Sequence, residues 1–171
     1  MRKTIFSVII IFLAFLLFLL TYNYRSEQEQ FFSKYSLSNE EITIIKDGDI
    51  ILRHGYGIVS DMIVKTLNEK YNISHCAIIV RDDNKLKVIH TVSQSISDID
   101  GIQQQGLKTF IKHSKNNSII VVRFKHDNEN AGQIISNKAK ELLKQKVPFD
   151  HSFDINDDSE LYCSELIWKI L

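Results

Sequence analysis

The sequence predicts an α+β domain, an antiparallel sheet packed with helices, preceded by an N-terminal transmembrane helix. Three observations predict it: strand-like segments gather mid-chain, helical patterns surround them, and an uncharged apolar stretch opens the chain. The 171 residues carry 21 basic and 21 acidic side chains, so no field that would attract nucleic acid is expected. Two cysteines are too few for a disulfide scaffold.

Residues 1–22 are expected to form a membrane anchor or signal segment. After "MRK" come about 19 residues without charge, enough to cross a hydrocarbon core of about 30 Å as a helix. The apolar run is longer than a typical signal core, and no A-x-A site ends it. An uncleaved anchor is therefore favoured over a cleaved signal or a buried core helix. Arg2 and Lys3 favour a domain outside the cytoplasm, in the periplasm or at the cell exterior, although Arg25 weakens this bias.

The remaining chain divides into a polar stalk with an entry helix at 23–45 and a folded domain at 46–171. Periodicity and turn residues predict the elements of this domain. The expected strands are 49–53, 74–80, 85–92 and a buried strand at 118–124, with a hairpin at "RDDN". The expected helices are 57–71, 106–113, 130–146 and a final helix that carries Cys163.

Cys163 lies in the first turn of this final helix, on the same face as Leu166, Ile167 and Ile170. Unpaired backbone N–H groups and the helix dipole lower a thiol pKa there and favour the nucleophilic thiolate. Acidic residues just before the helix would raise the thiol pKa and so oppose this effect. From the helix alone, a cysteine that simply fills the core remains the competing interpretation.

Two histidines are expected on one face of the hairpin. Strand alternation puts His75, Ala77 and Ile79 on one face and Cys76 on the other. With a two-residue loop at 83–84, positions whose numbers sum to 167 face each other, so His90 lies opposite Ala77 and diagonal to His75. Such a pair suggests that one ring orients the other, as in a nucleophile–base–orienter arrangement; a polar pair at a strand end is the alternative. The other histidines are expected to be ordinary surface residues: His54, His113, His126 and His151.

No metal or cofactor is expected. His75, His90 and Cys163 could ligate zinc, but no spacing typical of a zinc motif supports this. A calcium-loop pattern places Ser159 where glycine is needed, so chance is the favoured explanation. Positions 1, 3, 5 and 12 of that pattern are Asp154, Asn156, Asp158 and Glu165.

Four stretches together resemble one family: "DGDIILRHGYGIVSDMI", "ISHCAIIV", "KVIHTV" and "FDHSFDINDDSELYCSELIWK". They are similar to the circularly permuted branch of the NlpC/P60 papain-like cysteine hydrolases, and most closely to its YiiX/YebB-like members. In that branch the histidine strand precedes the cysteine helix, which is the order found here. The resemblance implies a permuted papain-like domain over residues 46–171. The absence of a C-cap after the final helix suggests a truncated C-terminus.

By this resemblance, Cys163 falls at the nucleophile and His75 at the general base. His90 falls at a third polar position that is a glutamate in many bacterial members and a histidine in the lecithin:retinol acyltransferase-like relatives. Tyr162 and Ser164 flank the nucleophile, and the Cys163 backbone N–H would stabilise an oxyanion.

The expected function is a membrane-anchored cysteine hydrolase that cleaves amide or acyl bonds. A peptide, a peptidoglycan stem peptide or a lipid acyl group would serve as substrate, and the residues do not separate these. A non-catalytic envelope protein that binds peptide or lipid in the same fold is the alternative.

Overall fold

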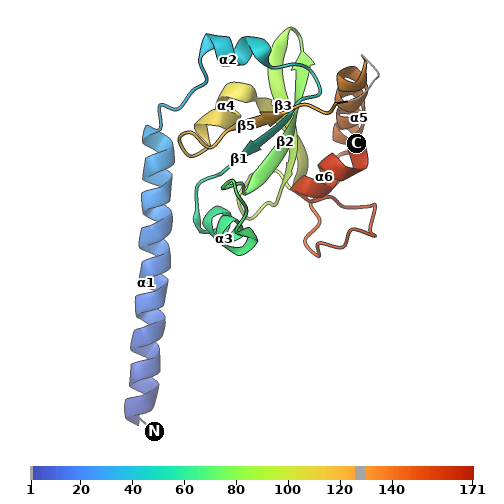
Figure 1. Ribbon diagram of the computed structural model, residues 1–171. Coiled ribbons are helices and arrows are strands. Elements are labelled where there is room, and N and C mark those ends of the chain that lie inside the picture. Colours follow the sequence, from blue (N-terminus) through green and yellow to red (C-terminus); the bar gives the residue numbers. More distant parts are fainter. Residues whose placement is uncertain (1, 126–129) are drawn as a thin grey trace.

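The computed structural model describes residues 2–125 and 130–171, so His126 lies outside the described residues. Figure 1 shows a long N-terminal helix beside a domain in which helices pack around one sheet. The helices are α1 (Arg2–Phe32), α2 (Asn39–Ile44), α3 (Ile58–Leu67), α4 (Leu107–Lys112), α5 (Ala131–Gln145) and α6 (Cys163–Ile170). The strands are β1 (Ile50–Arg53), β2 (His75–Asp82), β3 (Lys85–Val92), β4 (Gly101–Gly106) and β5 (Ile120–Val122).

The five strands form one antiparallel sheet in the order β4-β3-β2-β1-β5, which confirms the predicted α+β class. Both faces of the central strand β2 are buried: Ala77 and Ile79 point to one face, Ile78 and Val80 to the other, and all four are fully buried. Helices α5 and α6 cover the face of Ile78, and α4 covers the opposite face.

The β2–β3 hairpin has the predicted register. Asp83 and Asn84 form its turn with φ of 46° and 60°, the left-handed conformation that a two-residue type I′ turn requires. The paired residues run from Ile78 with Ile89 to Asp82 with Lys85, and each pair sums to 167. This confirms the register from which the two histidines were expected to share a face.

Two edge strands differ from the sequence expectation. The segment 118–124 was predicted as a buried strand, but β5 spans only three residues at the sheet edge and Val122 is 40% exposed. An apolar run does not distinguish a central strand from an edge strand. Strand β4, "GIQQQG", was not predicted, because its three glutamines show no alternation of apolar and polar residues.

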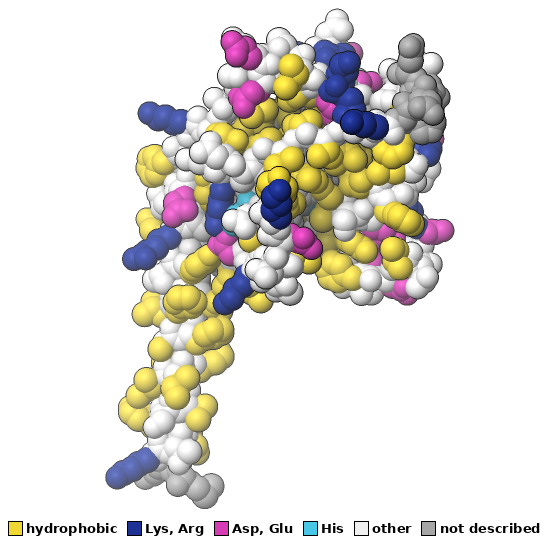
Figure 2. Space-filling model, viewed as in Figure 1, with side chains coloured by type: hydrophobic (Ala, Val, Ile, Leu, Met, Phe, Trp, Pro, Cys, Tyr) yellow, Lys and Arg dark blue, Asp and Glu magenta, His cyan; other side chains and the backbone are white. Residues whose placement is uncertain are grey.

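Helix α1 continues without a break from the apolar stretch into the polar residues and ends at Phe32. It is long and apolar enough to cross a membrane, with a mean hydropathy of 2.9 over its most apolar window. Figure 2 shows hydrophobic side chains along the part of α1 that extends away from the domain. The connection that follows leads into α2, where Ser38 and Glu41 form a reciprocal capping box with bonds of 3.2 Å and 2.7 Å.

A close backbone contact joins the start of β1 to α5. Gly48 has φ of 82°, and a Cβ atom at this position would overlap the backbone of Gly132 in the first turn of α5. Only glycine combines a positive φ with the absence of a Cβ atom, so only glycine fits this position without strain.

We therefore expect Gly48→Ala to lower the free energy of unfolding by about 3 kcal/mol, from backbone strain and overlap together. Chemical unfolding of the full chain in mild detergent measures this change. Gly106→Ala is the matched control: its Cβ would meet only Thr109 Oγ1 at 3.9 Å, and it should cost less than about 1 kcal/mol. Equal losses in the two variants would contradict the contact.

Candidate active site

Cys163 is the first residue of α6, and contacts on both sides fix its position. Before it, the buried Leu161 donates its N–H to the Pro148 carbonyl at 3.0 Å, and its own carbonyl accepts from Thr91 Oγ1 at 2.6 Å. After it, Leu166 and Ile170 are fully buried against the sheet, where each such side chain contributes about 2 kcal/mol. The thiol is therefore held at the end of β2 by packed structure.

His75 and His90 lie side by side, as the register predicts. His75 Nε2 and His90 Nδ1 are 2.8 Å apart, and their rings meet edge to face with centroids 5.0 Å apart. The Phe110 ring of α4 lies 5.9 Å from the His75 ring and 5.7 Å from the His90 ring. Since Nε2 of His75 is engaged by His90, its Nδ1 is the nitrogen left for the Cys163 thiol, with which His75 hydrogen-bonds.

Gln105 of β4 extends this line of groups. Its side-chain amide nitrogen lies 2.7 Å from His90 Nε2. A carboxamide offers a donor at one end and an acceptor at the other. Gln105 can therefore hold His90 in either tautomer, and with it either protonation state of His75.

The two cysteines meet at the end of the sheet, although the side chain of Cys76 points to the face opposite His75. Cys76 Sγ donates to the Cys163 carbonyl at 3.1 Å, and both cysteines are free thiols. Hydrogen bonding from the Cys76 thiol, followed by His75, lowers the pKa of Cys163 well below its ordinary value, although burial raises it. The same contact with Cys163, together with burial, raises the pKa of Cys76 well above its ordinary value. Of the two thiols, Cys163 is therefore the one that loses its proton more readily.

Both histidines are kept neutral by their surroundings. Burial lowers the pKa of His75, against the opposing effect of its hydrogen bond to Cys163. Burial and the neighbouring His75 lower the pKa of His90 well below its ordinary value. Neutral rings can accept a proton, which suits His75 to act as a base.

Arg53 adds a positive charge that the sequence reasoning missed. It faces His75 in the β1–β2 register, its guanidinium stacks 4.1 Å from the Phe110 ring centroid, and Nη1 donates to the Phe110 carbonyl at 2.9 Å. Its Nε is buried and has no hydrogen-bond partner among the described residues. Burial lowers the pKa of Arg53 to about 10, and the charge of Cys163 opposes this shift. An arginine at a strand end gives no sequence signal that separates it from a surface charge.

The residues that flank Cys163 lie at the start of α6. The half-buried Tyr162 ring packs 5.4 Å from Phe153, and the Tyr162 N–H donates to Glu165 Oε2 at 3.4 Å. Ser164 is exposed. Of the other described histidines, His113 interacts electrostatically with His90 and Arg53, and the exposed His151 has its Nε2 3.4 Å from Asp100 Oδ1. His54, expected at the surface, is buried against Asp61 instead.

Within residues 2–125 and 130–171, no group of three His, Cys, Asp or Glu side chains is arranged to hold a metal ion. In the calcium-like pattern, Glu165 is buried and caps α6 rather than facing the loop. The side chains of the described residues therefore show no arrangement that fits a zinc or calcium centre.

A family model described as "permuted papain-like amidase enzyme, YaeF/YiiX, C92 family" matches residues 44–171. The chain is also similar to the crystal structure of the metalloprotein YiiX from Escherichia coli O157:H7, with 27% identity and a TM-score of 0.59. That match covers 73% of this chain and 63% of the other, so this chain spans less than two thirds of its relative. The search of curated proteins found no match. The first two findings confirm the predicted YiiX-like, permuted papain-like fold.

The lowered pKa of Cys163 predicts fast alkylation at neutral pH. Iodoacetamide should modify Cys163 with a midpoint well below the free-thiol pKa of about 8.5, and Cys76 should react slowly. His75→Ala and Cys76→Ala should each move the midpoint to higher pH, because each removes a donor to the thiolate. Peptide mass spectrometry over a pH series measures both sites.

His151→Ala is the matched control, because this histidine is exposed, pairs with Asp100 and is not among the groups that shift the pKa of Cys163. It should leave the midpoint unchanged. If iodoacetamide modified both cysteines slowly and equally in the chain without substitutions, the lowered pKa of Cys163 would be contradicted.

Proposed function

The chain belongs to the permuted papain-like amidase family, and from this premise we propose that it is a membrane-anchored cysteine hydrolase with Cys163 as nucleophile. One observation carries the proposal: a line of hydrogen-bonded groups runs from Gln105 through His90 to His75 and ends at a thiol of lowered pKa. Its members come from three strands and a helix start, an arrangement typical of a nucleophile, its base and an orienting group.

In the first half of the reaction His75 takes the proton of the Cys163 thiol and becomes an imidazolium, and the resulting thiolate attacks the substrate carbonyl carbon. The new S–C bond displaces the carbonyl electron pair onto oxygen, and the Cys163 N–H at the helix start donates to this oxyanion. When the oxyanion collapses, the C–N bond breaks and the amine leaves with a proton from His75. The product that remains on the enzyme is a thioester.

In the second half, water attacks the thioester while His75 accepts its proton. The acid is released and the Cys163 thiolate is restored. His90 orients His75 throughout, and Gln105 supports His90 by turning its amide or its carbonyl toward the ring. Arg53 contributes a positive charge that favours the thiolate and the oxyanion. No step requires a metal, although the YiiX relative is described as a metalloprotein.

Substrate and location follow from the N-terminal helix and the family. An amidase family favours a peptide-type amide, including peptidoglycan stem peptides, and a lipid acyl bond is the second class we propose. Helix α1 would anchor the chain, and Lys3 before its apolar part favours a domain outside the cytoplasm, in the periplasm or at the cell exterior.

Full-length protein in detergent should turn over a member of a panel of γ-glutamyl peptide amides, lipid amides and lipid esters. Cys163→Ala should abolish this turnover, and His75→Ala should lower kcat by about 10²–10⁴-fold. Trp168→Phe, an exposed position on the same helix, is the control and should retain full activity. Turnover that survives Cys163→Ala would contradict the mechanism. An unreactive Cys163 together with binding of a panel member would instead favour a non-catalytic binding protein.

A further inference from the structure

Helix α3 is apolar, yet the domain does not bury it. None of its ten residues, all within the described part of the chain, is buried. Six of the ten are apolar, and three of these are strongly exposed: Val59 at 51%, Met62 at 61% and Leu67 at 58%. A surface helix of a globular domain normally buries its apolar stripe against the core, so the apolar side of α3 lacks a cover.

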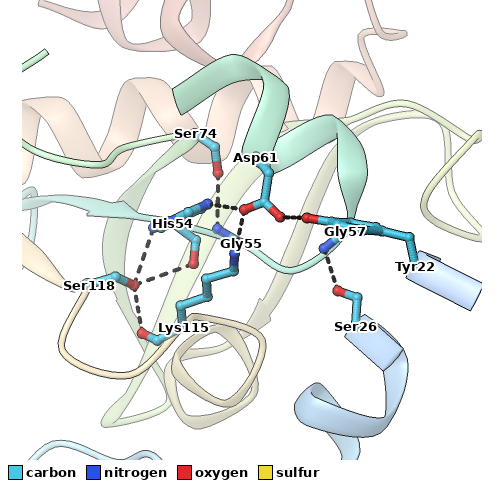
Figure 3. A network of polar contacts seen from close by, with 9 residues as sticks. All are labelled: Tyr22, Ser26, His54, Gly55, Gly57, Asp61, Ser74, Lys115 and Ser118. Atoms are coloured by element: carbon cyan, nitrogen blue, oxygen red, sulfur yellow. Dashed lines mark hydrogen bonds and ion pairs between the residues drawn. The ribbon is translucent and has the colours of Figure 1, made fainter. Parts of the chain in front are cut away.

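Helix α1 is hydrogen-bonded to the beginning of α3 (Figure 3). The Tyr22 hydroxyl donates to Asp61 Oδ2, and the buried Ser26 accepts the Gly57 N–H at 2.7 Å. Two further donors, His54 Nε2 at 2.7 Å and Lys115 Nζ, meet the other oxygen of Asp61. Burial alone would raise the pKa of Asp61, but these bonds outweigh it and lower the pKa, so the carboxylate that accepts them stays charged.

The contact at Tyr22 fixes the level of α3 along α1. The uncharged stretch from residue 4 to residue 22 is about 28 Å long at 1.5 Å per residue, close to the hydrocarbon thickness of about 30 Å. If α1 spans a bilayer, Tyr22 lies at the membrane–water boundary, where tyrosine is enriched. Asp61 is bonded to Tyr22, so Met62 next to it lies at the same depth.

Other features of this end of the domain agree with such a position. In Figure 1, α3 and the chain between α5 and α6 lie at the end of the domain toward which the apolar part of α1 extends, and α2 lies at the opposite end. That connecting chain also exposes Phe153 and Ile155. Lys65 in the last turn of α3 is exposed, and a basic residue beside apolar ones is typical of interfacial helices.

We infer that α3 is an interfacial helix that inserts Val59 and Met62 into the surface of the same bilayer that α1 crosses. The inference rests on the membrane anchoring in the proposed function and is independent of the catalytic step. Two attachments, α1 and α3, would then fix the orientation of the domain. Their joint network borders the active site: Ser74 accepts the Gly55 N–H at 3.0 Å and directly precedes His75. The site would then lie at the end of the domain that is nearest the bilayer.

Tryptophan quenching by brominated lipid tests this position. Trp168 is the chain's only tryptophan, so Trp168→Phe gives a silent background for single reporters. The full-length protein, with Met62→Trp in this background, is reconstituted in phosphatidylcholine vesicles with and without bromine on the acyl chains. We expect Met62→Trp to be quenched at least about threefold more than the control Ile44→Trp, because an interfacial helix buries its apolar face about 5–10 Å deep. Ile44 is also exposed and apolar, but lies on α2.

A third reporter, Leu13→Trp, separates the two possible failures. Quenching of Leu13→Trp with equal, weak signals at positions 62 and 44 would overturn the insertion of α3 and leave the anchor intact. A Leu13→Trp signal that bromine does not change would overturn the anchor, and the insertion of α3 with it. Neither readout depends on turnover, so a failure of the proposed chemistry remains distinguishable from both.

Discussion

The two-residue turn at Asp83 and Asn84 sets the register on which the rest of the site depends. Its left-handed backbone matches the twist of β2 and β3 and fixes which residues face each other. A slip of one residue would turn His90 to the face covered by α5 and α6, away from His75. The β1–β2 pairing then places Arg53 opposite His75, and the β3–β4 pairing brings Gln105 to the face of His90.

Burial gives this set of groups an unusual charge balance. It lowers the pKa of both His75 and His90, so neutral imidazoles are favoured. Arg53, whose pKa of about 10 keeps it charged at neutral pH, is therefore a permanent positive charge beside Cys163, in addition to the imidazolium that forms when His75 takes the thiol proton. A buried guanidinium with a free Nε–H is costly unless an anion meets it. The thiolate and the developing oxyanion are the anions that this site supplies.

The sequence was sufficient for the parts of the site that local pattern controls. Strand alternation and the turn predicted that His75 and His90 share a face, and helix periodicity placed Cys163 in a first turn. The contact between Cys76 and Cys163 was not predictable, because strand alternation gives the face of Cys76 but not where α6 begins against the sheet. Gln105 was missed because "GIQQQG" has no apolar pattern that predicts a strand. Its contact with His90 depends on the pairing of β3 with β4, which the sequence did not predict. Arg53 and His54 were missed because a polar residue at the end of a short strand, or directly after it, looks solvent-exposed.

The residues that hold α1 and α3 lie close to the active-site residues, because both sets lie at the end of β1 and at the start of β2. Arg53 ends β1 and His54 follows it, and Ser74 directly precedes His75 at the start of β2. His54 bonds Asp61 and Ser74 bonds Gly55, so the residues that hold α1 and α3 are chain neighbours of the residues that hold the thiolate. Tilting the domain on α1 would require breaking the bonds to Asp61, which is charged and partly buried. In the proposed arrangement, the angle between the membrane and the site is therefore set by hydrogen bonds rather than by a flexible stalk.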